Sequence, residues 1–210
     1  MSDITLFKST LPADAFIEAS KDFDKTAPRA DAGGVPLLRM LKQDGSWVYG
    51  KDNIEVEEGG QFAIDPSSLA QGYIAWHMMK VEGERMSAMG QPAVDPADLP
   101  PVQAKNGWEA QVAFGLIAVG GEDDGTAVLW KVNTKGGIDA WNAIYDSMKA
   151  RAAAQKPYAP IVELDHTSYK HPEYGMIYKP VFNIVGWVGD EEEVPQVEDK
   201  PAPRKRARRA

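Results

Sequence analysis

Short apolar runs separated by turn-forming residues dominate the chain from about residue 36 onward. Residues 36–50, "PLLRMLKQDGSWVYG", place Asp44 and Gly45 between two apolar runs, which predicts a β-hairpin. Residues 53–65, "NIEVEEGGQFAID", alternate apolar and acidic positions before a glycine pair, as is typical of a half-buried strand. Residues 72–84, "GYIAWHMMKVEGE", predict one further strand bounded by glycines.

The second half of the chain contains the clearest helical pattern. Residues 137–155 place apolar side chains three and four positions apart and end just before Pro157, which predicts an amphipathic helix. A proline-rich surface loop is expected at 90–107 before the helix. The remaining apolar runs predict a second hairpin from 107–121 and 125–133, and a final strand pair from 160–169 and 175–188.

Several strands, one helix and a final strand pair make up the expected order. The fold class is therefore mainly β with one helix (α+β), and the order fits a Greek-key β-barrel of the oligonucleotide-binding (OB) type with extra strands. A mixed α+β sandwich would give a similar string. We expect a loosely ordered arm at 1–34, the barrel domain at 35–189 and a disordered acidic-then-basic tail at 190–210.

Composition narrows the class of protein. The chain of 210 residues suits one domain with tails, and it has no apolar run long enough for a transmembrane helix. The first residues, "MSDITLFKST", do not have the pattern of a secretory signal. With no cysteine there is no disulfide or thiolate metal site. We expect an intracellular protein, in the host cytoplasm if it is viral, without a membrane partner.

The net charge of −8 is unevenly distributed. Residues 190–199 hold six acids and no base, while 200–210 hold six bases, which leaves 25 acids and 17 bases in the body. The acidic charge of residues 1–189 argues against non-specific binding of duplex DNA over the whole surface, but it allows a locally basic groove. The tail has three interpretations: an arm that contacts nucleic acid, a segment that competes with nucleic acid for the body, or an element without a function in binding.

Signals for catalysis are weak. No G-x-S-x-G, P-loop or H-E-x-x-H motif occurs, and Asp123 with Asp124 is typical of a solvated turn. Asp165, His166 and His171 could be imagined as a metal site, but their spacing gives no regular ligand geometry. We therefore expect no enzyme, no cofactor and no metal, and keep a metal-dependent nuclease as a remote alternative.

Residues 166–187, "HTSYKHPEYGMIYKPVFNIVGW", mix aromatic rings with cations, a combination that single-stranded nucleic acid requires. The same combination recurs where a ring neighbours a lysine elsewhere in the chain. The candidate stacking residues are Trp47, Tyr49, Trp130, Tyr169, Tyr174 and Tyr178. The candidate phosphate contacts are Lys51, Lys80, Arg85, Lys131, Lys135, Lys170 and Lys179, with Arg204, Lys205, Arg206, Arg208 and Arg209 of the tail.

Two stretches carry a resemblance to a family. Residues 107–137 and 160–188, with the pattern "SY-x-H-x-x-YG-x-I-Y-x-P-V-F" from Ser168 to Phe182, resemble small phage-encoded single-stranded DNA-binding proteins with an OB barrel. The resemblance covers about 36–188 and implies single-stranded DNA as ligand, with replication or recombination proteins as partners. Members of that family often end in an acidic tip that recruits partners, whereas this chain ends in "PRKRARRA".

Alternatives to this interpretation remain open. RNA in place of DNA, and self-association, are not decided by the sequence. The rival from another class is a phage virion structural or assembly protein, in which the rings would be core and interface residues.

Overall fold

The computed structural model describes residues 14–15, 17–18, 35–173 and 175–190. Its ten strands are β1 (Leu37–Met40), β2 (Trp47–Tyr49), β3 (Ile54–Glu55), β4 (Gln61–Ile64), β5 (Ala70–His77), β6 (Lys80–Ala88), β7 (Glu109–Val119), β8 (Ala127–Val132), β9 (Pro160–His171) and β10 (Gly175–Trp187). The helices are α2 (Lys135–Ala153) and the 3-10 turns η1 (Pro66–Ser68) and η2 (Pro96–Asp98), and positions 14, 15, 17 and 18 are also helical. The expectation of a mainly β protein with one long helix is confirmed.

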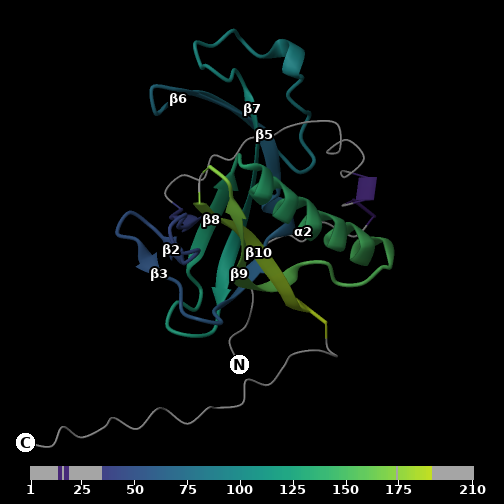
Figure 1. The fold of residues 1–210 in the computed structure, drawn as a ribbon. Coiled ribbons are helices and arrows are strands. Elements are labelled where there is room, and N and C mark those ends of the chain that lie inside the picture. The colour runs from purple at the N-terminus through teal and green to yellow at the C-terminus, as the bar shows by residue number, and fades with distance from the viewer. Residues whose placement is uncertain (1–13, 16, 19–34, 174, 191–210) are drawn as a thin grey trace, which may run out of the picture.

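All ten strands belong to one mixed sheet (Figure 1). The main path runs β10-β9-β4-β7-β8-β1-β2-β3, and β5 pairs with both β6 and β7 beside this path. Only the β1–β8 pair is parallel among the pairings described. The first strand after α2 therefore returns to lie beside β4 instead of continuing from β8.

The sheet is not closed into a barrel, in contrast to the expected closed Greek-key barrel. Within the described residues, the path ends at β10 on one side and at β3 on the other. The free edge of β8 is taken by β1, which pairs Leu37 with Leu129 and Leu38 with Trp130. The other edge of β8 is paired with β7, and no pairing between β8 and β10 is described.

Aromatic packing, instead of a backbone ladder, joins β10 to β8. The ring centroid of Phe182 lies 4.8 Å from that of Trp130, 5.2 Å from that of Phe114 and 5.5 Å from that of Trp47. These four buried residues form the ring cluster, the centre of the main hydrophobic core. Tilted and edge-to-face contacts at such distances stabilise a core beyond the area that they bury.

Helix α2 supports the same core from one side. Its N-cap, Thr134, accepts a hydrogen bond from the backbone N–H of Gly137, and its apolar stripe is buried. Trp141 of that stripe also donates from its indole nitrogen to the carbonyl oxygen of Ala113 on β7 over 3.1 Å. The helix lies within two residues of the predicted range at each end, because the three- and four-residue spacing of its apolar positions is a strong local signal.

The three hairpins expected around 36–50, 107–133 and 160–188 are confirmed as β1–β2, β7–β8 and β9–β10. The single strand expected at 72–84 is wrong, since the chain turns within it at Met78 and Met79 to form the β5–β6 hairpin. Both methionines have positive φ angles, 47° and 63°, in a turn without glycine or asparagine. The usual sequence signal of a tight hairpin is therefore missing.

The tail at 191–210 and most of the arm at 1–34 lie outside the described residues. Of the arm, Ile17 packs against the main core. No helix within the described ranges combines the length and hydropathy that a membrane crossing requires.

Truncation of Phe182 tests the ring cluster. We expect Phe182→Ala to lower the free energy of unfolding by about 3–5 kcal/mol, because the cavity opens where three other rings meet. Met176→Ala, at a half-exposed position of the same strand, should cost less than about 0.5 kcal/mol. Urea unfolding of both variants measures the difference, and equal costs would contradict the account of the core.

Candidate nucleic-acid interface

A groove of about 630 Å³ lies over the seam between β10 and the β1–β8 pair, and we call it the seam groove. Two tyrosines and five cations line it: Tyr169, Tyr178, Arg39, Lys42, Lys131, Lys135 and Lys179. None of the described residues that line it is acidic. In a chain with a net charge of −8, this is a local concentration of positive charge beside aromatic rings.

Tyr169 and Lys179 are two exposed residues of this lining that lie side by side. The tyrosine is 43% exposed, and the Lys179 ammonium nitrogen lies 4.8 Å from the centre of its ring. The β9–β10 register places Tyr169 opposite Ile177 and Lys179 opposite Thr167, so the two side chains meet diagonally across the hairpin. The arrangement offers an accessible ring with a cation beside it, as base stacking next to a phosphate requires.

Tyr178 is held by the turn between β1 and β2. Its ring packs edge-on to His166 at 5.2 Å, and both rings lie against Gly45. A Cβ at Gly45, where φ is +81°, would stand 2.7 Å from each ring. In the same turn, the Ser46 backbone N–H and hydroxyl donate to the Asp44 carboxylate, which lowers the pKa of Asp44. Glycine at 45 is therefore required for the approach of the turn to the β9–β10 hairpin.

Asp165 is engaged within the same hairpin. Hydrogen bonds, first from the His166 backbone N–H and then from the Asn183 side chain, lower the pKa of the Asp165 carboxyl. In the described part of the chain, no three His, Asp or Glu side chains are grouped to hold a metal ion. The set of Asp165, His166 and His171 is thus not brought together as a metal site.

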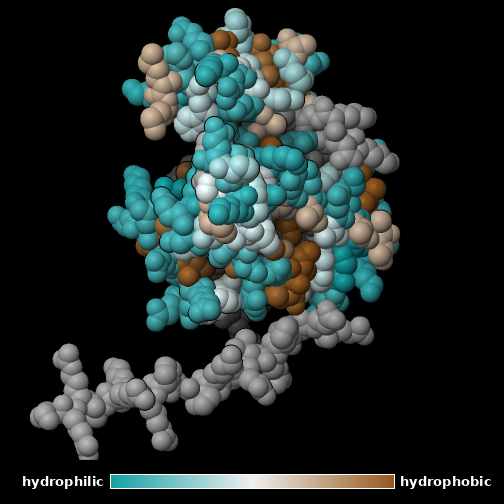
Figure 2. Space-filling model, viewed as in Figure 1, coloured by the Kyte–Doolittle hydropathy of each residue, from teal (hydrophilic) through white to brown (hydrophobic). Residues whose placement is uncertain are grey.

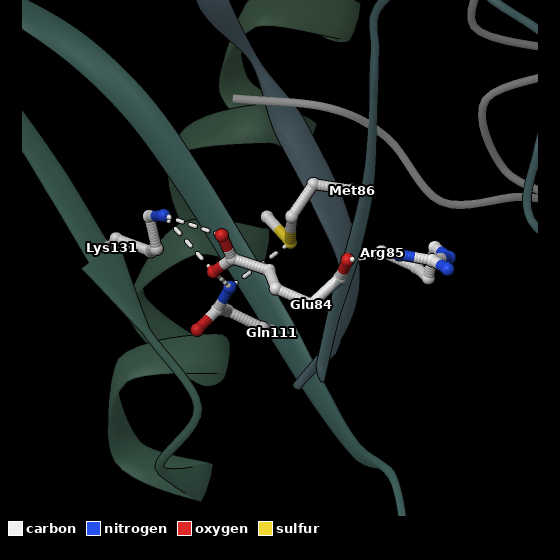
Figure 3. A network of polar contacts seen from close by, with 5 residues as sticks. All are labelled: Glu84, Arg85, Met86, Gln111 and Lys131. Carbon is white, nitrogen blue, oxygen red and sulfur yellow. Dashed lines mark hydrogen bonds and ion pairs between the residues drawn. The ribbon is translucent and has the colours of Figure 1, made fainter. Parts of the chain in front are cut away.

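Lys131 is bound to an acid that reaches it from the β5–β6 hairpin (Figure 3). Its ammonium nitrogen lies 3.0 and 3.2 Å from the two carboxylate oxygens of Glu84. Gln111 on β7, which lies between them, donates to the same carboxylate over 2.6 Å. The pair is partly buried, so Lys131 enters the groove with its charge largely offset.

A second groove, the edge groove, adjoins the first and has a volume of about 930 Å³. Its lining includes exposed apolar side chains of Val35, Leu37 and Ile54, together with Lys51. Arg39 and Lys131 line both grooves, so these two cations stand where the grooves meet. An extended ligand could follow both grooves past this point.

Three of the candidate stacking residues are core residues. Trp130 and Trp47 belong to the ring cluster, and the Trp47 indole donates to the carbonyl oxygen of Asp165. Tyr49 is 7% exposed, and its hydroxyl donates to Asp123 over 2.6 Å, which raises the pKa of Tyr49. Trp130 borders the seam groove and Tyr49 the edge groove, but all three rings are at most 7% exposed. Their assignment as stacking residues is therefore corrected: they are core residues.

The other candidates are distributed over several places. Lys80 and Arg85 belong to the β5–β6 hairpin, where Arg85 donates to the backbone carbonyl of Glu84 and lies away from the Glu84 carboxylate (Figure 3). Lys135 lines the seam groove and also pairs with Asp139. Lys170 is exposed but does not line either groove. Outside the described residues lie Tyr174, Arg204, Lys205, Arg206, Arg208 and Arg209.

Two cations of the seam groove, Arg39 and Lys42, were not among the sequence candidates. Arg39 interrupts an apolar run and projects from the exposed side of β1, where its guanidinium donates to Gly50 and Asn53. An isolated cation in a predicted strand is the only signal that the sequence holds for it. This isolated cation points to the groove only when the pairing of β1 with β8 is known.

Comparison with known proteins adds no assignment. No protein-family model, no curated protein and no solved structure matches the chain.

Substitution of Gly45 tests how the turn positions the groove. Gly45→Ala should destabilise the fold by about 1–3 kcal/mol more than Gly50→Ala. Both glycines have positive φ, but a Cβ at Gly50 meets nothing within 4 Å. The control thus carries the backbone strain without the clash. Thermal or urea unfolding measures both variants, and an equal loss would mean that the turn does not press on Tyr178.

Proposed function

We propose that the protein binds single-stranded DNA in the seam groove and acts as a binding protein, not as an enzyme. The observation that carries the proposal is the lining of the groove, with an exposed tyrosine, a second tyrosine, five cations and no described acid. The rings would stack on bases and the cations would contact phosphates. Protection of single strands during phage replication or recombination, which the resemblance in the sequence implies, would use this activity.

The strand order supports an OB-type origin of the fold, which we include in the proposal. β9, β4, β7 and β8 lie in the spatial order of a Greek key, with α2 in the long connection before β9. The helix of an OB barrel has the same place between its third and fourth strands. β1–β3, β5 and β6 would be additions, and the β1–β8 pairing would have displaced the closing contact of β10.

Several features favour single strands over duplex as the ligand. Stacking on Tyr169 needs a base face that is free of its neighbours, which single strands provide at low cost. The body outside the grooves is acidic and would repel the long, uniformly charged surface of a duplex. The edge groove also offers apolar surface to bases that leave the seam groove.

A titration over a salt series tests the proposal. Fluorescence anisotropy of labelled oligo(dT) should show tighter binding than a labelled duplex of equal length, with an affinity that falls as salt rises. Equal affinity for the two ligands, or none for either, would contradict the proposal.

Removal of a groove cation gives a residue-level prediction. Lys179→Gln should weaken oligo(dT) binding and reduce the slope of log K against log salt by about 0.7, the value for one single-strand phosphate. Lys170→Gln, which removes a charge from the neighbouring strand outside the groove lining, should change the slope less. An equal effect of both substitutions would indicate that the overall positive charge of the β9–β10 hairpin attracts the DNA, without a specific phosphate contact in the groove.

Release of Lys131 should act in the opposite direction. Glu84→Gln removes the carboxylate that competes with phosphate for Lys131, so we expect oligo(dT) to bind more tightly and with a steeper salt slope. Glu163→Gln is the matched control, because Glu163 bonds the neutral Gln61 and not a cation. Weaker binding by Glu84→Gln would show that Glu84 orients Lys131 and does not mask it.

A further inference from the structure

The tip of the β5–β6 hairpin exposes apolar side chains on an unfavourable turn. Met78 and Met79 are 83% and 95% exposed, and both adopt the positive φ region that large side chains rarely enter. Asparagine and glycine are the residues that suit such a two-residue turn. Trp76 and Val81, which form the second pair from the turn, are 43% and 50% exposed. Strain and exposure coincide here, as they do at functional sites.

The hairpin is held in place from one side by the proline-rich loop. The carboxylate of Glu82 accepts hydrogen bonds from the backbone N–H groups of Gln103 and Ala104 over 2.8 and 2.9 Å. The ring of Trp108 covers Gly83, where a Cβ would lie 2.5 Å from it. Figure 1 shows this hairpin and loop extending together beyond the rest of the sheet. The apolar tip is thus presented on a supported arm.

The open side of the arm continues the candidate interface. Trp76 lies two residues after Ile74 along β5, and Ile74 is paired with Glu84, so Trp76 and Glu84 share one face of the sheet. Glu84 reaches Lys131, which lines both grooves. A ligand that leaves the grooves at Lys131 on this face therefore meets Trp76 next.

Charge also distinguishes the tip from an ordinary apolar patch. Glu82 is occupied by the loop and Glu84 by Lys131 and Gln111. Lys80 follows the two methionines directly and is exposed. In Figure 2 the tip, at the upper left, is coloured toward the hydrophobic end of the scale among hydrophilic neighbours. Apolar side chains beside a cation suit bases and phosphates together.

We propose that the hairpin tip is a second contact for the same DNA strand, with Trp76 stacked on one base and Met78 and Met79 inserted against its neighbours. Methionine is among the apolar side chains that proteins insert between bases. The proposal rests on the proposed function, because it extends the path of the strand from the seam groove along the sheet. An apolar protein surface, including a second copy of this chain, is the competing occupant.

A turn replacement separates binding from folding. The double variant Met78→Asn/Met79→Gly gives the turn its favoured residues, so its melting temperature should stay equal or rise while its affinity for oligo(dT) falls several-fold. Trp76→Ala should weaken binding by about 5- to 100-fold, whereas Trp76→Phe should keep most of the affinity. Each full-length variant is titrated by anisotropy, melted and examined by sedimentation velocity.

The outcomes distinguish the two proposals. If Lys179→Gln weakens binding but the double variant and Trp76→Ala bind as the original chain does, the hairpin contact is wrong and the proposed function stands. If the original chain does not bind oligo(dT), the proposed function fails, and the hairpin proposal with it. If the hairpin variants change the sedimentation of the protein without changing its DNA affinity, the tip is a protein-docking surface and the hairpin proposal is overturned.

Discussion

Four aromatic rings hold β10 against β8 in place of a backbone ladder. β1 pairs with β8 at Leu129 and Trp130, and β10, at one end of the main path, contacts the interior strand β8 through Phe182 and Trp130. Side-chain packing fills the core between the two strands but leaves a groove on the surface above it. The seam groove lies over this junction, between β10 and the β1–β8 pair.

The distribution of charge gives this junction its chemistry. The chain is acidic as a whole, yet acids near the seam are directed into the protein's own hydrogen bonds. Asp44 is held by Ser46 in its turn, Asp165 by His166 and Asn183, and Glu84 by Gln111 and Lys131. Cations of β1, β8 and β10 line the groove, and none of the described residues in its lining is acidic. Binding would thus depend on local arrangement and not on net charge.

Local patterns predicted the elements that depend on neighbours in sequence. Asp44-Gly45 predicted the β1–β2 hairpin, and the apolar spacing of 137–155 predicted α2. Long-range pairing could not be predicted: the parallel β1–β8 contact has no local signal, and it determines both the open sheet and the groove. For the site, the rings and cations of residues 166–187 predicted Tyr169, Tyr178 and Lys179, which line the seam groove. Trp130 was misassigned because its ring is buried in the ring cluster by long-range contacts, for which the sequence holds no local signal. The Met78–Met79 turn was missed because it lacks the residues that favour it.

Photocrosslinking tests the central claim most directly, because it reports which residues touch the bases. The protein would be irradiated with oligo(dT), digested and analysed by mass spectrometry, with excess duplex as competitor. The account predicts crosslinks in the peptides that hold Tyr169 and Tyr178, retained in the presence of duplex. Crosslinks confined to the outer surface of α2, or abolished by duplex, would contradict it.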